Sequence, residues 1–200
     1  MGQPREYKLL FTGSMGAGKT TAIAAISQVP PVRTDVANTD LGTFDKTTTT
    51  AAMDYGELTL EGGDRLRLYG TPGQARFDFM WKILGRGALG VVVLVDNSRP
   101  DPLDDLRTYL GAFADVARGA RAVVGIGRAE SHPSPDIAQF HAVAESLGLQ
   151  VPILSVDVRR REDVLLLLDI LFHQVEAQAP AIDDFAIDDI AIDDIRGGMA

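Results

Sequence analysis

The stretch Gly13-Ser14-Met15-Gly16-Ala17-Gly18-Lys19-Thr20 reads G-x-x-x-x-G-K-T, the pattern of a phosphate-binding P-loop. Residues 7–11 before it have the apolar character of a strand, and residues 21–26 after it have the character of a helix. The motif requires this order of strand, loop and helix, so we predict a P-loop. The alternative, a chance glycine-rich turn, leaves the flanking elements without an explanation.

The residue types of the motif suit the chemistry of phosphate groups. Three glycines let backbone N–H groups converge on phosphate oxygens, and the helix that follows directs the positive end of its dipole at them. Lys19 supplies a positive charge to the outer phosphates, and the Thr20 hydroxyl is a ligand for Mg²⁺. We therefore predict a nucleotide-binding set formed by Gly13, Ser14, Met15, Gly16, Ala17, Gly18, Lys19, Thr20 and Thr21.

Composition limits the other possibilities. Two hundred residues, 46% of them hydrophobic, suit one globular domain, and the chain shows neither a long apolar run nor a signal-peptide profile. Cysteine is absent, which excludes disulfides, thiolate metal sites and C-terminal lipidation. The net charge of −9 argues against nucleic acid as a partner. We expect a cytoplasmic protein without a membrane anchor of its own.

The last twenty residues differ from the rest. Residues 181–200 hold six Asp and one Arg, a net charge of −5, and they contain three copies of an Ala-Ile-Asp-Asp-x repeat. A period of five fits neither a strand nor a helix, so we predict a domain over 1–180 and a disordered acidic tail over 181–200. The tail is either a solubilising segment or a repeated docking motif for a multimeric basic partner.

Hydrophobic patterning along the chain predicts the fold class. Residues 51–60 and 65–69 alternate apolar and polar side chains around a turn, as in a hairpin, and the polar stretch 32–49 has no period and is expected to be a long loop. Apolar runs then alternate with amphipathic segments, which favours parallel strands connected by helices. The prediction is an α/β fold with a mostly parallel six-stranded sheet, one antiparallel edge strand and helices on both faces. The apolar runs lie at 91–95, 122–126 and 151–154, and the amphipathic segments at 103–118, 136–147 and 162–178.

Ligands bind at the carboxyl ends of the strands in such sheets. The P-loop lies at that edge, and the loops expected beside it are 71–76, 96–99, 127–132 and 155–161. Within them, Asp96 follows an apolar strand directly. It is either a metal-binding carboxylate of another P-loop class or the cap of a turn.

The order and spacing of these motifs resemble the Ras-like small GTPases, and more closely their bacterial MglA-like branch, over residues 6–178. The resemblance implies a P-loop NTPase G-domain that binds GTP or GDP with Mg²⁺. Thr50 precedes Asp54-Tyr55 by four residues, as the Mg²⁺-binding threonine of switch I does in the family. The alternative is that the threonine run 47–50 only favours entry into a strand.

The segment Tyr69-Gly70-Thr71-Pro72-Gly73-Gln74 resembles switch II. Eukaryotic members have an Asp at the position of Gly70, and this Asp holds a Mg²⁺-bound water. The MglA-like proteins lack it, as this chain does. The resemblance implies that the Gly73 N–H binds the γ-phosphate and that Gln74 orients the attacking water. Arg76 is either an internal arginine finger or a solvated helix residue. Gln74, Lys19 and Arg76 are thus the predicted catalytic residues.

The base-reading motif departs from the family. Gly127-Arg128-Ala129-Glu130 stands where the family has Asn/Thr-Lys-x-Asp. Arg128 has a stem that can cover a purine face, and Glu130 can accept hydrogen bonds from guanine. The later loop Ser155-Val156-Asp157-Val158-Arg159 aligns with the family's Ser-Ala-Lys loop, so the N–H of Val158 is expected to face the base, with Arg159 beside it. The preference for GTP or ATP stays open.

These patterns together predict a molecular switch that hydrolyses GTP slowly, in which segments 32–50 and 71–82 respond to the γ-phosphate. The resemblance implies a roadblock/longin-type, MglB-like regulator as partner, and an effector in a sensor-kinase or polarity system. Two alternatives remain: an ATP-using P-loop enzyme, and a nucleotide-binding scaffold with negligible hydrolysis.

Overall fold

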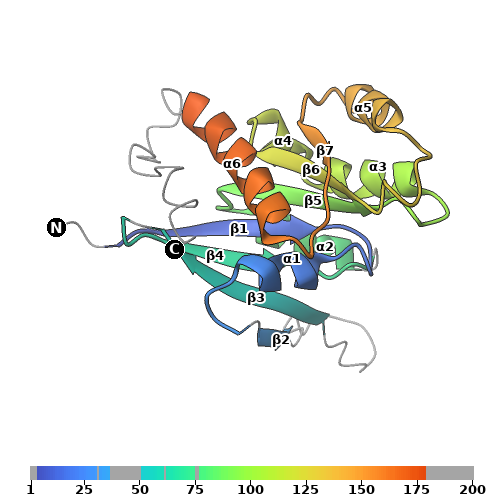
Figure 1. Ribbon diagram of the computed structural model, residues 1–200. Coiled ribbons are helices and arrows are strands. Elements are labelled where there is room, and N and C mark those ends of the chain that lie inside the picture. Colours follow the sequence, from blue (N-terminus) through green and yellow to red (C-terminus); the bar gives the residue numbers. More distant parts are fainter. Residues whose placement is uncertain (1–3, 31, 37–50, 61, 75–76, 179–200) are drawn as a thin grey trace, which may run out of the picture.

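A seven-stranded sheet forms the centre of the protein in the computed structural model, which describes residues 4–30, 32–36, 51–60, 62–74 and 77–178 (Figure 1). The strands follow the order β2-β3-β4-β1-β5-β6-β7. Their bounds are β1 Glu6–Thr12, β2 Val32–Val36, β3 Ala51–Thr59, β4 Arg65–Gly70, β5 Gly90–Asp96, β6 Ala122–Gly127 and β7 Ile153–Ser155.

The sheet is parallel from β4 to β7, and β3 is antiparallel to both of its neighbours. This confirms the predicted α/β fold with a mostly parallel sheet and one antiparallel strand. The structure adds a seventh strand, β2, where the sequence predicted only a loop. As a result β3 lies second from the edge. The segment 32–36 is short, and its hydrogen-bond partner as a strand is β3, with Val32 opposite Tyr55 and Val36 opposite Ala51.

Helices cover both faces of the sheet (Figure 1). One face packs on α1 and α6, through residues such as Ile23 and Leu168. The other face packs on α2, α3, α4 and α5, through residues such as Trp81, Leu106 and Phe140. The helix bounds are α1 Lys19–Ile26, α2 Asp78–Gly85, α3 Pro102–Ala112, α4 Ala114–Arg118, α5 Ile137–Ser146 and α6 Arg161–Ala177.

The central strands are buried on both faces, which explains their continuous apolar runs. All seven residues of β5 are buried, including Val91, Val92 and Val93 at 0% exposure. The segment 103–118, predicted as one helix, divides into α3 and α4 because the backbone at the buried Phe113 leaves helical geometry (φ −112°, ψ 24°).

The start of α3 has its own local signals. Asp101 caps the helix by accepting a 2.9 Å hydrogen bond from the Asp104 N–H, and Pro102 occupies the first turn. This fixed start places Asp105 and Tyr109 one turn apart on the same helix face. Three predictions, the threonine ligand Thr50, the arginine finger Arg76 and the tail 181–200, lie outside the described residues.

Candidate nucleotide-binding site

The predicted P-loop connects β1 to α1. Its glycines adopt positive φ angles, 141° at Gly13, 87° at Gly16 and 95° at Gly18. A Cβ atom at Gly13 would lie 2.1 Å from the carbonyl oxygen of Leu94, and one at Gly18 would lie 2.6 Å from a Val158 methyl group. Both positions therefore require glycine, and the loop packs tightly between β5 and the loop after β7.

Lys19 lies in the centre of this loop. Its side chain is buried, and its ammonium donates to the carbonyl oxygens of Gly13 (2.7 Å) and Ser14 (2.8 Å). Burial lowers the pKa of Lys19 to about 8, while the charge of Asp54 acts in the opposite direction. Because the Lys19 ammonium is buried, an anion that approaches it stabilises its charged form more strongly than it would in water.

Two more features fit phosphate at this position. The first turn of α1 has neither an acidic side chain nor a side-chain cap, so its N–H groups lack these competing acceptors. The Ser14 hydroxyl is buried and has no hydrogen-bond partner within the part of the chain that the structure describes. A ligand oxygen would satisfy both groups.

Thr20 and Asp54 supply oxygen atoms of the kind that Mg²⁺ prefers. The Thr20 hydroxyl donates a 2.5 Å hydrogen bond to Asp54 Oδ2, and Asp54 lies on β3. A hydroxyl and a carboxylate are hard donors that fit Mg²⁺ bound together with nucleotide phosphates. In the sequence, Asp54 served only to align Thr50 with switch I. Its role beside Thr20 depends on the pairing of β3 with β4.

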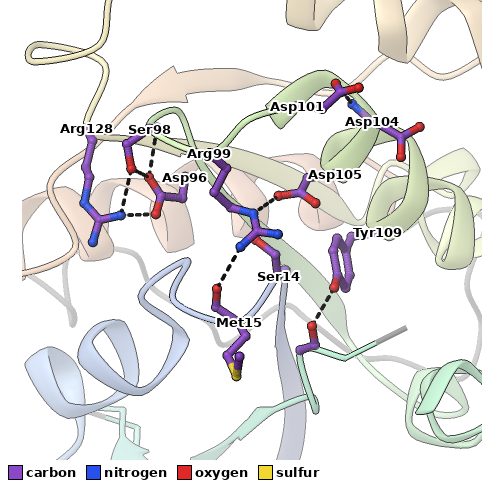
Figure 2. Close-up of polar contacts among 12 residues, drawn as sticks. Ser14, Met15, Asp96, Ser98, Arg99, Asp101, Asp104, Asp105, Tyr109 and Arg128 are labelled. Carbon is purple, nitrogen blue, oxygen red and sulfur yellow. Dashed lines mark hydrogen bonds and ion pairs between the residues drawn. The ribbon is translucent and has the colours of Figure 1, made fainter. Parts of the chain in front are cut away.

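The segment predicted as switch II lies against the P-loop. A Cβ atom at Gly73 would lie 2.7 Å from the Lys19 ammonium and 2.7 Å from the Met15 N–H nitrogen. Two contacts hold the segment from the helix side. The Tyr109 hydroxyl donates a 2.7 Å hydrogen bond to the Gly73 carbonyl (Figure 2), and the Trp81 indole N–H donates a 2.9 Å bond to the Pro72 carbonyl. The side chain of Gln74 is exposed.

Arg99, which is not among the residues predicted from the sequence, joins this cluster. Its Nε donates a 2.6 Å hydrogen bond to Asp105 Oδ2, and its Nη1 donates a 3.4 Å bond to the carbonyl of Met15 (Figure 2). The guanidinium thus lies beside the P-loop. The sequence did point to this region, because Arg99 lies in a loop predicted to border the ligand. That its side chain reaches the P-loop depends on the position of α3.

A cavity of about 560 Å³ continues from the P-loop and has the size of a small-molecule site. Three segments form most of its walls: the P-loop with Thr21, the loop after β6, and the loop after β7. Asp96 at the end of β5 and Asp163 on α6 complete the lining. The predicted base-contacting residues Arg128, Glu130, Val158 and Arg159 all line it. The P-loop residues Gly16, Ala17 and Gly18 line it as well, whereas Met15 is 66% exposed.

Asp96 acts in this cavity as a buried anchor. Its carboxylate accepts hydrogen bonds from the Ser98 N–H (3.0 Å) and hydroxyl (2.6 Å), and it forms an ion pair with Arg128 (Figure 2). Of the two interpretations of Asp96, these contacts favour the turn cap. The ion pair also fixes the direction of the Arg128 side chain, which sequence alone does not show.

Hydrogen bonds between Asp157 and Arg159 hold the loop after β7. Arg159 donates from its side chain to both carboxylate oxygens of Asp157, at 2.8 Å and 2.6 Å, and from its backbone N–H at 3.0 Å. These bonds lower the pKa of Asp157 to about 2. The N–H of Val156 is bound to the carbonyl of Ile126 (3.0 Å), and the side chain of Val158 packs on Gly18. The predicted contact of the Val158 N–H with a base stays a prediction.

A further residue braces the loop after β6. The side-chain amide of Asn97, which follows β5, donates to the carbonyl oxygens of His132 (2.5 Å) and Pro135 (3.0 Å). The backbone N–H of Asn97 donates to the carbonyl oxygen of Gly127 (3.0 Å). Gly127 itself has no side chain with which to brace this loop. Asn97 therefore connects the base-side loop to the sheet from a different strand.

Comparisons with known proteins agree with this architecture. Residues 31–118 match the model of a family described as a conserved hypothetical ATP binding protein. The matched segment lies between the P-loop and the loops at 127–132 and 155–161, so it includes none of the residues predicted to contact a base.

Individual relatives are distant. An uncharacterized protein of Methanocaldococcus jannaschii is 31% identical over 94 residues, 47% of this chain and 53% of that protein. Translation initiation factor IF-2 of Maricaulis maris is 24% identical over 90% of this chain, which spans only 20% of the factor. The Ras-related protein RabC of Dictyostelium discoideum is 21% identical over 86% of this chain and 84% of its own length.

The chain thus spans about half of the archaeal protein, a fifth of the initiation factor and most of RabC. The chain is similar to Ras-related proteins over most of its length, and the P-loop and the strand order agree with a P-loop nucleotide-binding fold. They do not assign the chain to the MglA-like branch. Within the ranges that the structure describes, no helix is both long and apolar enough to cross a membrane.

Proposed function

We propose that this protein is a nucleotide-dependent molecular switch that binds GTP with Mg²⁺ and hydrolyses it slowly. The observation that carries the proposal is the contact of Gly73 with the P-loop. The backbone of Gly73 lies against both the Lys19 ammonium and the Met15 N–H, the groups that face the outer phosphates in the predicted site. A third phosphate and the segment that contains Gly73 compete for the same two groups. Binding of the third phosphate therefore changes the position of that segment.

Lys19 and the N–H groups of the P-loop bind the phosphates and stabilise the charge that develops on them during hydrolysis. Mg²⁺, when bound, neutralises part of the phosphate charge; Thr20 and the predicted ligand Thr50 would hold it. Gln74 is the residue proposed to orient the attacking water. Its side chain is exposed, so we expect turnover to be slow until a partner holds it in place.

Guanine is the base favoured by the residues of the cavity. The Asp96 carboxylate is occupied by Arg128, whereas Glu130 lies at the exposed rim of the cavity. A carboxylate there accepts hydrogen bonds from the two adjacent N–H groups of guanine, whereas the corresponding edge of adenine presents an acceptor nitrogen that would repel it. The ATP-binding description of the matching family is the reason to keep an ATP-using enzyme as the second candidate.

The partners belong to the same proposal. We expect a roadblock/longin-type, MglB-like regulator that positions Gln74, and an effector that recognises the state of segments 32–50 and 71–82. Arg76 is the candidate for an internal arginine finger. The acidic tail would act as a solubilising or docking segment.

One experiment separates the candidates. Nucleotide released from the purified protein is identified by chromatography: GDP supports the switch, ADP or ATP supports the ATP-using enzyme, and unhydrolysed GTP supports the scaffold. The Gln74→Leu variant provides the second readout, because it is expected to slow single-turnover hydrolysis without weakening nucleotide binding. Hydrolysis that is indifferent to this substitution would remove the assigned role of Gln74.

A further inference from the structure

Asp54 and Gly70 occupy paired positions on neighbouring strands. They are opposite one another in the antiparallel ladder of β3 and β4, and Gly70 is the last residue of β4. Position 70 is where the eukaryotic Ras-like proteins have an aspartate that holds a Mg²⁺-bound water. The chain has glycine there and an aspartate directly across the ladder.

The two residues are also sterically coupled. A Cβ atom at position 70 would lie 3.0 Å from the Cβ of Asp54 and 3.1 Å from its Oδ2. Both distances are shorter than ordinary van der Waals contacts. Glycine at 70 therefore creates the space that the Asp54 side chain occupies.

The Asp54 carboxylate points at the P-loop threonine. Thr20 donates its hydroxyl hydrogen to Asp54 Oδ2 at 2.5 Å. Because a hydroxyl has one hydrogen and two lone pairs, a hydrogen committed to Asp54 leaves the lone pairs available to a metal ion. Asp54 thus fixes the orientation in which Thr20 can bind a cation, and it adds a negative charge beside that position.

We infer that Asp54 supplies the carboxylate of the Mg²⁺ site, in place of the acid that is absent at position 70. The inference rests on the proposed binding of a Mg²⁺-nucleotide complex and deepens it. In this chain the negative charge lies on β3, and Gly70 across the ladder leaves the space for it. Gly70 is then part of the metal site through the space it leaves rather than through a ligand atom.

The test measures retention of Mg²⁺ rather than hydrolysis. Dissociation of a fluorescent GDP analogue, or of the ADP analogue if the chain binds adenine, is followed during titration with Mg²⁺ and in excess chelator. Asp54→Asn keeps the size of the side chain and removes its charge. We expect the Mg²⁺ concentration for half-maximal slowing of release to rise about 10-fold or more, with release in chelator unchanged, since removing a group that orients a metal ligand typically costs 10–100-fold in metal affinity.

A charge-relocation variant gives the sharper test. Asp54→Ala combined with Gly70→Asp returns a carboxylate to β4 after clearing the space, and we expect Mg²⁺ dependence within a few-fold of the original protein. Gly70→Ala alone pushes its Cβ against Asp54 and should weaken Mg²⁺ retention. Glu57→Gln is the matched control, because Glu57 lies on β3 three residues from Asp54 and accepts the Tyr55 hydroxyl. Its Mg²⁺ dependence should stay unchanged.

The outcomes distinguish this inference from the proposed function. If the original protein retains neither nucleotide in a Mg²⁺-dependent manner, the proposed function and the inference fall together. If it does, and folded Asp54→Asn shows the same Mg²⁺ dependence, only the inference is overturned. Mn²⁺ binding to the nucleotide complex, measured by electron paramagnetic resonance, must show the same order of affinities among the variants.

Discussion

The hydroxyl of Tyr109 on α3 donates a 2.7 Å hydrogen bond to the carbonyl oxygen of Gly73. The ring of Tyr109 also contacts Trp81 on α2, with centroids 4.9 Å apart, and the Trp81 indole holds the carbonyl of Pro72. The segment that contacts the P-loop is thus held by two aromatic side chains. Trp81 is the single tryptophan of the chain and so is a built-in fluorescent reporter of that segment.

The first prediction concerns this contact. Tyr109→Phe removes one neutral hydrogen bond, which stabilises a protein by about 1 kcal/mol, so we expect a similar loss in the free energy of unfolding. The segment containing Gly73 is released more easily, so the change in Trp81 fluorescence between GDP and a non-hydrolysable GTP analogue should be altered. Tyr55→Phe, which removes a hydroxyl bound to Glu57 on β3, is the control. Equal fluorescence changes in all three proteins would contradict the assigned role of Tyr109.

The second prediction concerns Arg99. Because its guanidinium lies beside the P-loop carbonyl of Met15, Arg99→Ala should weaken binding of the triphosphate more than that of the diphosphate. A partly exposed ion pair contributes less than about 1 kcal/mol, so the difference should be about fivefold or smaller and should shrink at high salt. Asp105→Asn releases Arg99 from its partner and should act in the opposite direction. Titration calorimetry at two salt concentrations measures both; equal losses for the two nucleotides would show that Arg99 only braces the loop.

The third prediction concerns Lys19. Lys19→Met replaces the buried ammonium by an uncharged side chain of similar length, and nucleotide affinity should fall more than about 100-fold because the outer phosphates lose their central cation. The exposed Lys82 on α2 provides the control, since Lys82→Met should leave affinity unchanged. Calorimetry with GDP decides the matter. Unchanged affinity in a folded Lys19 variant would remove the P-loop assignment.

The fourth prediction concerns the base. Glu130→Asp combined with Gly127→Asn should sharpen the preference for guanine, because hydrogen-bonding groups in a site discriminate mainly by leaving the wrong partner unpaired. The structure accommodates the change at 127, where a new Cβ would meet only an ordinary 3.6 Å contact with the Val95 carbonyl oxygen. Competition of GTP against ATP measures the preference. Identical selectivity in both proteins would mean that Glu130 already reads the base or that this loop does not.

The sequence by itself determined the parts of this protein that depend on neighbours along the chain. The P-loop occupies eight consecutive residues, and the φ angles of its glycines and the start of α1 are local properties. The alternation of apolar runs and amphipathic helices also fixed the α/β class, because a parallel strand buried on both faces leaves a continuous apolar run and a helix buried on one face leaves a period of 3.6 residues. Arg128 and Glu130 were selected because their loop follows a recognisable strand and stands where the Ras-like family has its base-reading motif.

The tertiary structure alone decided which distant side chains complete the site. Asp54 meets Thr20 from 34 positions away through the register of β3 and β4, and Arg99 reaches Met15 across 84 positions through the placement of α3. Strand β2 was missed because a short edge segment becomes a strand only when a partner supplies its hydrogen bonds. Sequence patterns record which face of an element is buried, whereas the pairing of two specific polar groups depends on strand register and helix packing, which have no local signature.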